Sequence, residues 1–543
     1  MYIYKNILRG GLITTLLYLL AFLIFTIRYA TNDDVFLNFY SSGVLNGSPT
    51  ELLVYYHFIL GLILKYLYIV FPYVNWYSAL LLFVHFSSSW YINYNIIKLG
   101  NNLRSSIVFI LLLFFSLDIF LIIKLQYTST AMKAASVGFL SLFMSSYAGI
   151  KMSKSRFIIV GYFLVVAYFI RSQALLGIIL ISLPVFGYLF LQSRDIKIII
   201  SYFFIALFII AAKFTQNIYY ENKTSQKELF EYVAAQEVLQ NDPLNVKKEY
   251  LNEIGWSQND FYLMNRNWFF VDPVKYTPEN FSKLSQSLYK RYSIDLALKE
   301  FFNGINNYKR YLFMASILLI LILFFSSGKI RNYVLICTGG LIGIYFYLAM
   351  FKRMNERVIV PLFFFTLLLG VYLYLWENNR INLPDKRKVL LKITLIILLA
   401  IGLIYQMYAL KVTNQKAVDL RADFYDAYDD LVSLNEYLVI IPGGAFPYEG
   451  YPLFVSPNRY ILNNLVPTSW TAQTPPFNLV KEYHNLSNLT LDIVEIDHIL
   501  LHGIDTTYFK LFVKENYDIS IEYAEIDFAE FKYLEPVYLI NKK

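Results

Sequence analysis

The sequence predicts a mostly α-helical protein that crosses a membrane many times and carries a small α/β domain at its C-terminal end. Hydrophobic residues make up 57% of the 543 residues and charged residues only 16%, a composition typical of multi-span membrane proteins. Apolar runs of spanning length recur along residues 1–410. Residues 411–543 instead mix short apolar runs with polar segments, which favours a separate α/β domain.

Eleven apolar runs are predicted to span the membrane, because each approaches the roughly 20 residues that a spanning helix needs. The first run follows Lys5 and Arg9 but lacks a small-x-small cleavage site, so we expect it to be retained as a helix. Another run, 52–71, contains His57 and Lys65 and is predicted to lie flat on the membrane surface. The predicted spans are 8–27, 74–97, 105–123, 129–149, 156–170, 172–191, 197–213, 310–327, 332–350, 358–376 and 390–410.

Basic residues in the short connecting segments predict the orientation, because positively charged loops face the cytoplasm. They fall on one side together with the N-terminus, in the segments 98–104, 151–156, 192–197, 328–331 and 377–389. We therefore expect a multi-pass protein of the plasma membrane with a cytoplasmic N-terminus. The segments 28–73, 214–309 and 411–543 then lie outside the cell.

Two domains are predicted, a transmembrane domain over 1–410 with outer loops 28–73 and 214–309, and an extracytoplasmic α/β domain over 411–543. The second domain contains 10 basic and 19 acidic residues, so the net charge of +8 comes from loops beside the spans. Nucleic acid is therefore not implied as a partner. The expected strands and helices of this domain cover 437–444, 497–503 and 536–543, and about 414–435, 475–486 and 506–517.

The sequence indicates no metal site. Cys337 is the single cysteine, which excludes disulfides within the chain and sites built from several thiolates. His498 and His502 are four residues apart but fall in a strand-like run, where packing is more typical than metal binding. The question of a divalent cofactor stays open.

An acidic pair, Asp33 and Asp34, follows directly on the first predicted span in "RYATNDDVFLNFYSSG". In a structural interpretation, Asp34 caps a short helix, "VFLNFYSSG", that ends at Gly43. In a catalytic interpretation, one carboxylate is a general base that takes a proton from a hydroxyl group. Because Asp34 immediately precedes the apolar run, we expect Asp33 to be the base and Asp34 the cap.

The order of segments after the acidic pair resembles the GT-C superfamily of membrane glycosyltransferases, such as mannosyl- and arabinosyltransferases. "YSSGVLNGSP", a half-apolar surface helix and "FPYVNWYSALLLFV" follow in turn. In that family an acidic motif lies in the first outer loop and surface helices follow it. The resemblance implies a hexosyl- or pentosyltransferase with Asp33 or Asp34 as general base. It also implies a polyprenyl-phosphate-linked sugar as donor and a glycan, lipid or protein as acceptor.

Two charged residues fall in or beside the third predicted span, where charge is costly. Asp118 lies toward its outer end and Lys124 closes it. Asp118 either faces a polar cavity that receives substrate or forms an ion pair with Lys133 that holds two spans together. The sequence leaves both interpretations open.

Cations at two outer turns run against the usual charge distribution of membrane proteins. Arg171 and Gln173 lie at the turn of one hairpin, and Lys352, Arg353 and Arg357 lie at another turn. A guanidinium group binds phosphate through two parallel hydrogen bonds. We therefore predict a pocket for the donor's phosphate, with attraction to anionic lipid headgroups as the alternative.

The loop 214–309 contains Trp256, Asp260 and Trp268 within "WSQNDFYLMNRNW". Aromatic rings and carboxylates in alternation suit sugar binding, and the same composition occurs in the aromatic belts of membrane proteins. We retain all three as candidate substrate-binding residues.

Three other functions compete with sugar transfer. A polysaccharide polymerase or ligase would use the same substrates with its chemistry at the outer arginines. A lipid or glycan transporter would need no chemistry, but two similar halves, which many transporters have, are not evident in the sequence. A surface receptor would use the acidic C-terminal domain.

Overall fold

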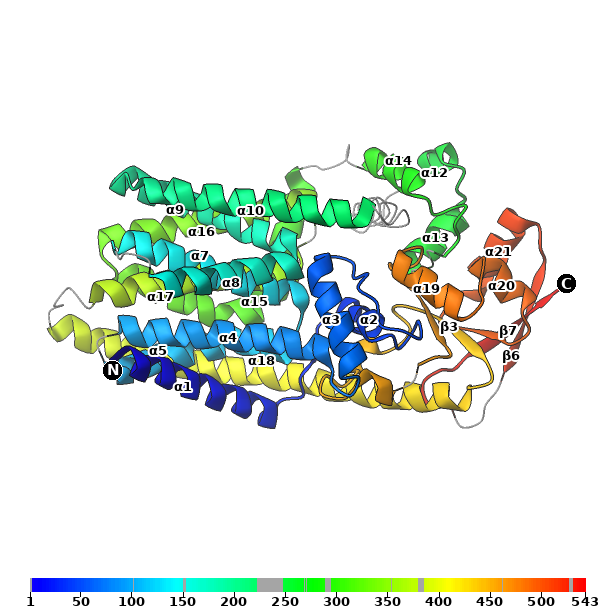
Figure 1. Cartoon of the computed structure of the whole chain (residues 1–543), viewed down its shortest axis with the longest axis horizontal. Coiled ribbons are helices and arrows are strands. Elements are labelled where there is room, and N and C mark those ends of the chain that lie inside the picture. The colour runs from blue at the N-terminus through cyan, green and yellow to red at the C-terminus, as the bar shows by residue number, and fades with distance from the viewer. Residues whose placement is uncertain are drawn as a thin grey trace.

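The computed structural model describes residues 2–100, 102–149, 153–221, 248–267, 269, 271–288, 294–352, 354–378, 385–460, 462–526 and 531–543. Long helices lie side by side in one bundle, and an α/β unit extends from one end of it (Figure 1). The bundle helices are α1 (Tyr2–Ile24), α4 (Trp76–Leu99), α5 (Leu103–Leu113), α7 (Tyr127–Tyr147), α8 (Lys154–Ile170), α9 (Ser172–Ser193), α10 (Ile196–Glu221), α15 (Ile294–Phe325), α16 (Gly328–Phe351), α17 (Glu356–Asn378) and α18 (Asp385–Ser433).

The helical bundle has the character of a membrane protein. Within the described ranges, six helices are long and apolar enough to cross a bilayer. They are Tyr4–Ile24, Leu103–Ile123, Ser172–Ser193, Ile196–Glu221, Gly328–Phe351 and Glu356–Glu377. The membrane character predicted from composition is confirmed, and the count of eleven spans and their orientation stay predictions.

Helix α7 forms the centre of the bundle. It packs against α4, α8, α9 and α17, and Tyr127–Phe143 are all buried. Small residues such as Ala131, Ala134 and Ala135 are wholly enclosed and let neighbouring helices approach closely. The polar side chains of α7 are therefore surrounded by protein.

Two predicted spans have features that hydropathy did not predict. The span expected over 105–123 consists of α5, a π-helical turn η1 (Phe114–Asp118) and α6 (Ile119–Ile123). The span expected over 390–410 and the separate helix expected near 414–435 are one continuous helix, α18. At 1.5 Å per residue, α18 is about 74 Å long. It links the bundle to the C-terminal sheet (Figure 1).

The first outer loop is folded against the end of the bundle. Strand β1 (Arg28–Tyr29) pairs in parallel with β2 (Lys124–Leu125). Helix α2 (Asn32–Ser42) ends at Gly43, as predicted, and Gly43 adopts the left-handed conformation with φ 83°. Helix α3 (Phe58–Val70) has 13 residues, or about 20 Å, which is short for a bilayer core of about 30 Å. This length agrees with the surface position expected for 52–71.

The second outer segment contains α12 (Lys248–Glu253), α13 (Gln258–Asn267) and α14 (Pro278–Leu288). It packs against the C-terminal unit. The rings of Tyr262 and Tyr508 stack across this contact, with centroids 3.7 Å apart. Asn259 Nδ2 also donates to Glu515 at 2.7 Å. Between 214 and 309 the described residues are mostly helical, and 222–247 lies outside the described residues.

The C-terminal unit contains a five-stranded sheet in the order β4-β3-β5-β7-β6. Strand β3 is parallel to both β4 and β5, whereas β7 is antiparallel to β5 and β6. The three predicted strands are confirmed as β3, β5 and β7, and β4 and β6 were not predicted. The bounds are β3 (Leu438–Pro442), β4 (Leu465–Thr468), β5 (Ile499–His502), β6 (Ile521–Ile526), β7 (Val537–Lys542), α19 (Pro475–Tyr483), α20 (Leu489–Glu495) and α21 (Thr506–Tyr517).

Replacing Gly43 should destabilise the first outer loop. Its positive φ disfavours any residue with a Cβ, and an added Cβ would overlap the backbone of Ser48. We expect Gly43→Ala to cost about 1–3 kcal/mol, measured as a lower thermal unfolding midpoint in detergent. Gly444→Ala is the matched control, because no atom lies within 4 Å of its added Cβ. Equal midpoints for both variants would contradict this account of the turn.

Candidate functional site

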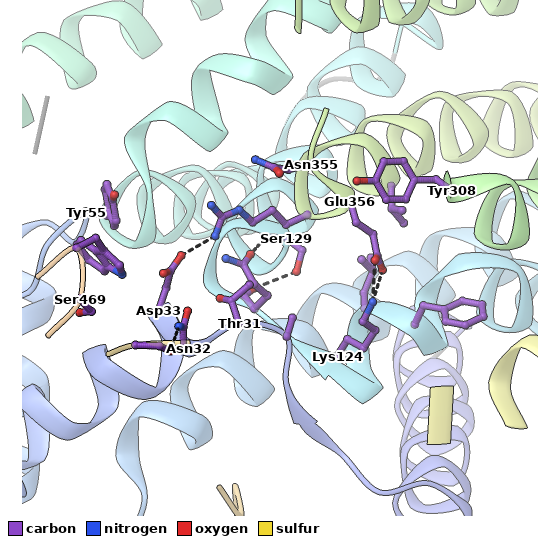
Figure 2. A pocket seen from close by; sticks show the side chains of 18 residues that line it. Thr31, Asn32, Asp33, Tyr55, Lys124, Ser129, Tyr308, Asn355, Glu356 and Ser469 are labelled. Carbon is purple, nitrogen blue, oxygen red and sulfur yellow. Dashed lines mark hydrogen bonds and ion pairs between the residues drawn. The ribbon is translucent and has the colours of Figure 1, made fainter. Parts of the chain in front are cut away.

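A cavity of about 360 Å³ lies where the first outer loop, the end of the bundle and the C-terminal sheet meet (Figure 2). We call it the Asp33 cavity. It is lined by Ala30, Thr31, Asn32, Asp33, Tyr55, Phe120, Leu121, Lys124, Gln126, Ser129, Tyr308, Asn355, Glu356, Arg357, Val360, Gly443, Ser469 and Trp470.

The sheet contributes the carboxyl ends of two neighbouring parallel strands to this cavity. Gly443 follows β3, and Ser469 and Trp470 follow β4. This edge is where open parallel sheets commonly hold ligands. Asn32 Nδ2 donates to the carbonyl oxygen of Gly443 at 2.7 Å, so the start of α2 is fastened to the same edge.

Asp33 and Arg357 meet in the cavity. Asp33 lies in the first turn of α2, and Arg357 in the first turn of α17. Arg357 Nη1 donates to Asp33 Oδ2 at 2.7 Å, and the side chains are 26% and 16% exposed, respectively. Residues 324 positions apart in the chain are thus brought together.

A second ion pair lies on the same wall. Lys124 Nζ is 2.7 Å from both carboxylate oxygens of Glu356. Asp33, Arg357, Glu356 and Lys124 therefore balance one another in charge. Among the described residues, no group of three or more His, Cys, Asp or Glu side chains is arranged to hold a metal ion.

Aromatic rings form the other side of the cavity. The ring centroids of Tyr55 and Trp470 are 5.4 Å apart, and Tyr55 stacks on Tyr127 at 5.9 Å. Tyr55 has φ 75°, which is strained for a residue with a large side chain. In Figure 2, Tyr55 and Ser469 lie on one side of Asp33, and Lys124 and Glu356 lie on the other.

Arg171 lies behind this aromatic wall. Its guanidinium carbon is 4.4 Å from the ring centroid of Tyr55. The guanidinium also donates to the hydroxyl of Thr128 and to Gln173 Oε1, each at 3.1 Å. Arg171 and Gln173 support the wall and are not among the residues that line the cavity.

Asp34 is fully buried and does not cap its own helix. Helix α2 begins at Asn32, before the position predicted, and the Asp34 carboxylate accepts the first backbone N–H of α7, from Tyr127, at 2.9 Å. It also accepts the hydroxyls of Tyr77 and Thr31, both at 3.0 Å. The predicted capping role is therefore corrected: Asp34 caps α7 and fixes α2 against it.

Burial raises the pKa of Asp34 to about 7. The hydrogen bond from Tyr127 N–H opposes this shift, and the neighbouring charge of Asp33 adds to it. Of the two neighbouring carboxylates, that of Asp33 lines the cavity.

Asp118 forms a buried ion pair with Lys133. Its other carboxylate oxygen accepts the hydroxyl of Ser89 at 2.7 Å, and Tyr18 is hydrogen-bonded to the same Ser89 at 3.1 Å. This network joins η1 to α7 and lies away from the residues that line the cavity. The geometry matches the ion-pair interpretation of Asp118.

The predicted site residues Trp256 and Asp260 are buried within the second outer segment. Trp256 is 2% exposed, and its Nε1 donates to the carbonyl oxygen of Lys275 at 3.0 Å. Asp260 is wholly buried and accepts Asn516 Nδ2 at 2.8 Å, which joins this segment to α21. Neither side chain lines the Asp33 cavity.

The remaining predicted site residues are Lys352, Arg353 and Trp268. Lys352 is half-buried just after α16 and does not line the cavity. Arg353 and Trp268 lie outside the described residues.

Glu356 and Tyr55 are among the cavity residues that were not predicted as site residues. Glu356 directly precedes Arg357, and an acidic residue beside a predicted basic cluster gives no sign that it lines the same cavity. Tyr55 follows the first outer helix in "ELLVYYHF", where an aromatic run gives no sign of a strained backbone. Hydrophobicity alone could not distinguish Tyr55 from its neighbours.

Comparison of the chain with protein-family models, curated proteins and solved structures finds no match.

The raised pKa of Asp34 predicts a pH-dependent stability. An unfolded chain ionises this carboxyl near pH 4, whereas the folded protein holds the proton up to about pH 7. Stability should therefore fall as the pH rises from about 4 to about 7 and level off above it.

The measurement compares thermal unfolding midpoints of the wild type and Asp34→Asn over this pH window. Asn keeps an acceptor for the N–H of Tyr127 and does not titrate, so the difference between the two proteins isolates this carboxyl. The wild type should lose stability relative to the variant with rising pH. A constant difference would show that Asp34 is ionised throughout.

Proposed function

We propose that this chain transfers a sugar from a polyprenyl-phosphate-linked donor to an acceptor hydroxyl at the outer face of the membrane. The observation that supports this function is the meeting of Asp33 with Arg357 in one cavity at the end of an apolar bundle. A carboxylate can take a proton, and a guanidinium can bind a phosphate. Both groups are needed for this transfer.

The cavity is divided into halves of different chemistry. Lys124 and Arg357, each paired with a carboxylate, lie at the bundle side, and their N–H groups suit the oxygens of the donor's phosphate. Tyr55 and Trp470 provide ring faces at the sheet side, which suit stacking against a sugar ring. Asp33 lies between Tyr55 and Lys124 (Figure 2), so the reacting bond would lie beside its carboxylate.

In the proposed reaction, Asp33 takes the proton of the acceptor hydroxyl as its oxygen attacks the anomeric carbon. The bond between that carbon and the phosphate oxygen breaks, and polyprenyl phosphate leaves with the bonding electrons. Arg357 stabilises the negative charge on the leaving group. The polyprenyl chain remains in the bilayer, beside the apolar helices of the bundle.

Asp33 and Arg357 cannot perform these roles while they are bonded to each other. The donor's phosphate must replace Asp33 as the partner of Arg357, and this exchange frees the carboxylate to accept a proton. Donor binding therefore precedes activation of the acceptor. The pair borders the cavity and is partly exposed, so an incoming phosphate can reach Arg357 and take the place of the Asp33 carboxylate.

The proposed orientation follows the charge distribution of the sequence. The protein spans the plasma membrane eleven times, with its N-terminus in the cytoplasm and the Asp33 cavity and sheet outside. The acceptor is a glycan, lipid or protein that reaches the cavity from this side.

Asp33→Asn should abolish sugar transfer, by about 10²–10⁴-fold, because an amide cannot accept the proton. Asp34→Asn should be milder, within about tenfold, because Asn keeps the bond to Tyr127. The assay measures release of polyprenyl phosphate from labelled polyprenyl-phosphate-linked hexose or pentose by reconstituted protein. Wild-type rates in Asp33→Asn would remove Asp33 from the mechanism.

Donor binding should change in opposite directions in two variants. Asp33→Asn removes the competitor for Arg357, so the donor should bind more tightly. Arg357→Lys keeps the charge but loses the forked geometry, so the donor should bind more weakly. Equilibrium binding of labelled donor tests both, and weaker binding in Asp33→Asn would contradict the exchange.

A further inference from the structure

A second cavity, of about 80 Å³, lies at the opposite end of the helical bundle. We call it the Lys98 cavity. Helix α17 carries Glu356 at the Asp33 cavity and Trp376 at this one, so the two cavities are about 30 Å apart along that helix. That distance is the thickness of a bilayer core. The cavity is lined by Tyr91, Asn95, Lys98, Leu99, Ser141, Met144, Ser145, Ala148, Arg156, Tyr372 and Trp376.

Two cations face the Lys98 cavity without a carboxylate to balance them. Lys98 lies at the end of α4 and Arg156 in the first turn of α8. Neither forms an ion pair with an acidic side chain in the ranges that the structure describes. Each cation of the Asp33 cavity, by contrast, has its own carboxylate. Two like charges beside one cavity favour an anion within it.

The observed contacts of Lys98 and Arg156 leave further N–H groups that can donate to a ligand. Arg156 Nη1 donates to Ser145 Oγ at 3.3 Å, and a guanidinium has five N–H donors in all. The Lys98 ammonium lies 5.7 Å from the ring centroid of Tyr94. A tetrahedral phosphate group has several acceptor oxygens and could bond both cations at once.

The surroundings of the cavity suit a lipid. Tyr91 and Trp376 are ring systems of the kind that lies at headgroup depth. Phe157 and Ile158, directly after Arg156, are 69% and 68% exposed and provide an apolar surface for acyl chains. A volume of 80 Å³ accommodates a phosphate group but not a whole lipid. Basic pockets between membrane helices are known binding sites for lipid headgroups.

We infer that the Lys98 cavity binds the phosphate group of an anionic membrane phospholipid, whose acyl chains lie against the start of α8. This site lies in the leaflet opposite to the Asp33 cavity. The inference does not depend on the proposed sugar transfer. It requires only that the helical bundle lies in a membrane.

The test compares lipid retention by wild type and the double variant Lys98→Gln/Arg156→Gln. Each protein is incubated with mixed micelles of phosphatidylglycerol and phosphatidylcholine, and bound lipids are counted by native mass spectrometry. We expect wild type to retain at least one phosphatidylglycerol in preference to phosphatidylcholine. The double variant should lose this preference by about tenfold or more. Equal preference in both proteins would overturn the site.

Two controls separate the site from general surface charge and from misfolding. Lys154→Gln/Lys197→Gln removes two exposed cations that do not line the cavity and should keep the preference. Lys98→Arg/Arg156→Lys keeps both charges and should also keep it. Loss of the preference in the first control would assign binding to net charge and overturn the site.

Inorganic phosphate distinguishes a lipid from a soluble anion. The apolar surface beside Arg156 should make phosphatidylglycerol bind far more tightly than phosphate alone, so about 10 mM inorganic phosphate should leave the retained lipid in place. Complete displacement of the lipid at that concentration would overturn the lipid assignment in favour of a free phosphate ligand.

Discussion

The architecture of the Asp33 cavity depends on the bond between the buried Asp34 carboxylate and the first N–H of α7. This bond fastens the first outer loop to the central helix of the bundle. The parallel pairing of β1 with β2 also holds the first outer loop to the bundle. It places Lys124 beside the Asp33 cavity. A helix N-terminus favours negative charge, and three donors meet this carboxylate. With α2 fixed in this way, Asp33, the residue before Asp34, faces the cavity.

Two ion pairs of similar composition have different roles because their exposure differs. Lys133 and Asp118 are 0% and 8% exposed, so separating them would leave charge stranded in a low-dielectric interior at a cost of about 3–5 kcal/mol. Their pairing is therefore a permanent part of the bundle. Arg357 and Asp33 border the cavity and are 26% and 16% exposed. The same chemistry thus gives an enclosed pair in one place and a partly exposed pair in the other.

Local sequence signals predicted the local features. Gly43 marked the end of α2, and apolar runs marked β3, β5 and β7. The partner of Asp34 lies 93 residues away, and no local pattern encodes such a distance. The helices expected over 390–410 and near 414–435 are one helix, because hydropathy falls near residue 411 without a glycine or proline to end the helix there. Helix α7 contains many polar side chains, since it is enclosed by protein and not by lipid, so hydropathy describes it poorly.

The continuous helix α18 determines how the sheet and the bundle move together. At the end of this helix, Asp430 accepts the backbone N–H groups of Tyr533 and Leu534 at 2.8 and 2.9 Å, which clamps the sheet to it. Nearer the bundle, Arg421 Nη2 donates to the carbonyl oxygen of Ile27 at 2.8 Å. A helix without a break resists bending and transmits torque. The sheet is therefore held at a fixed distance from the bundle by one unbroken helix.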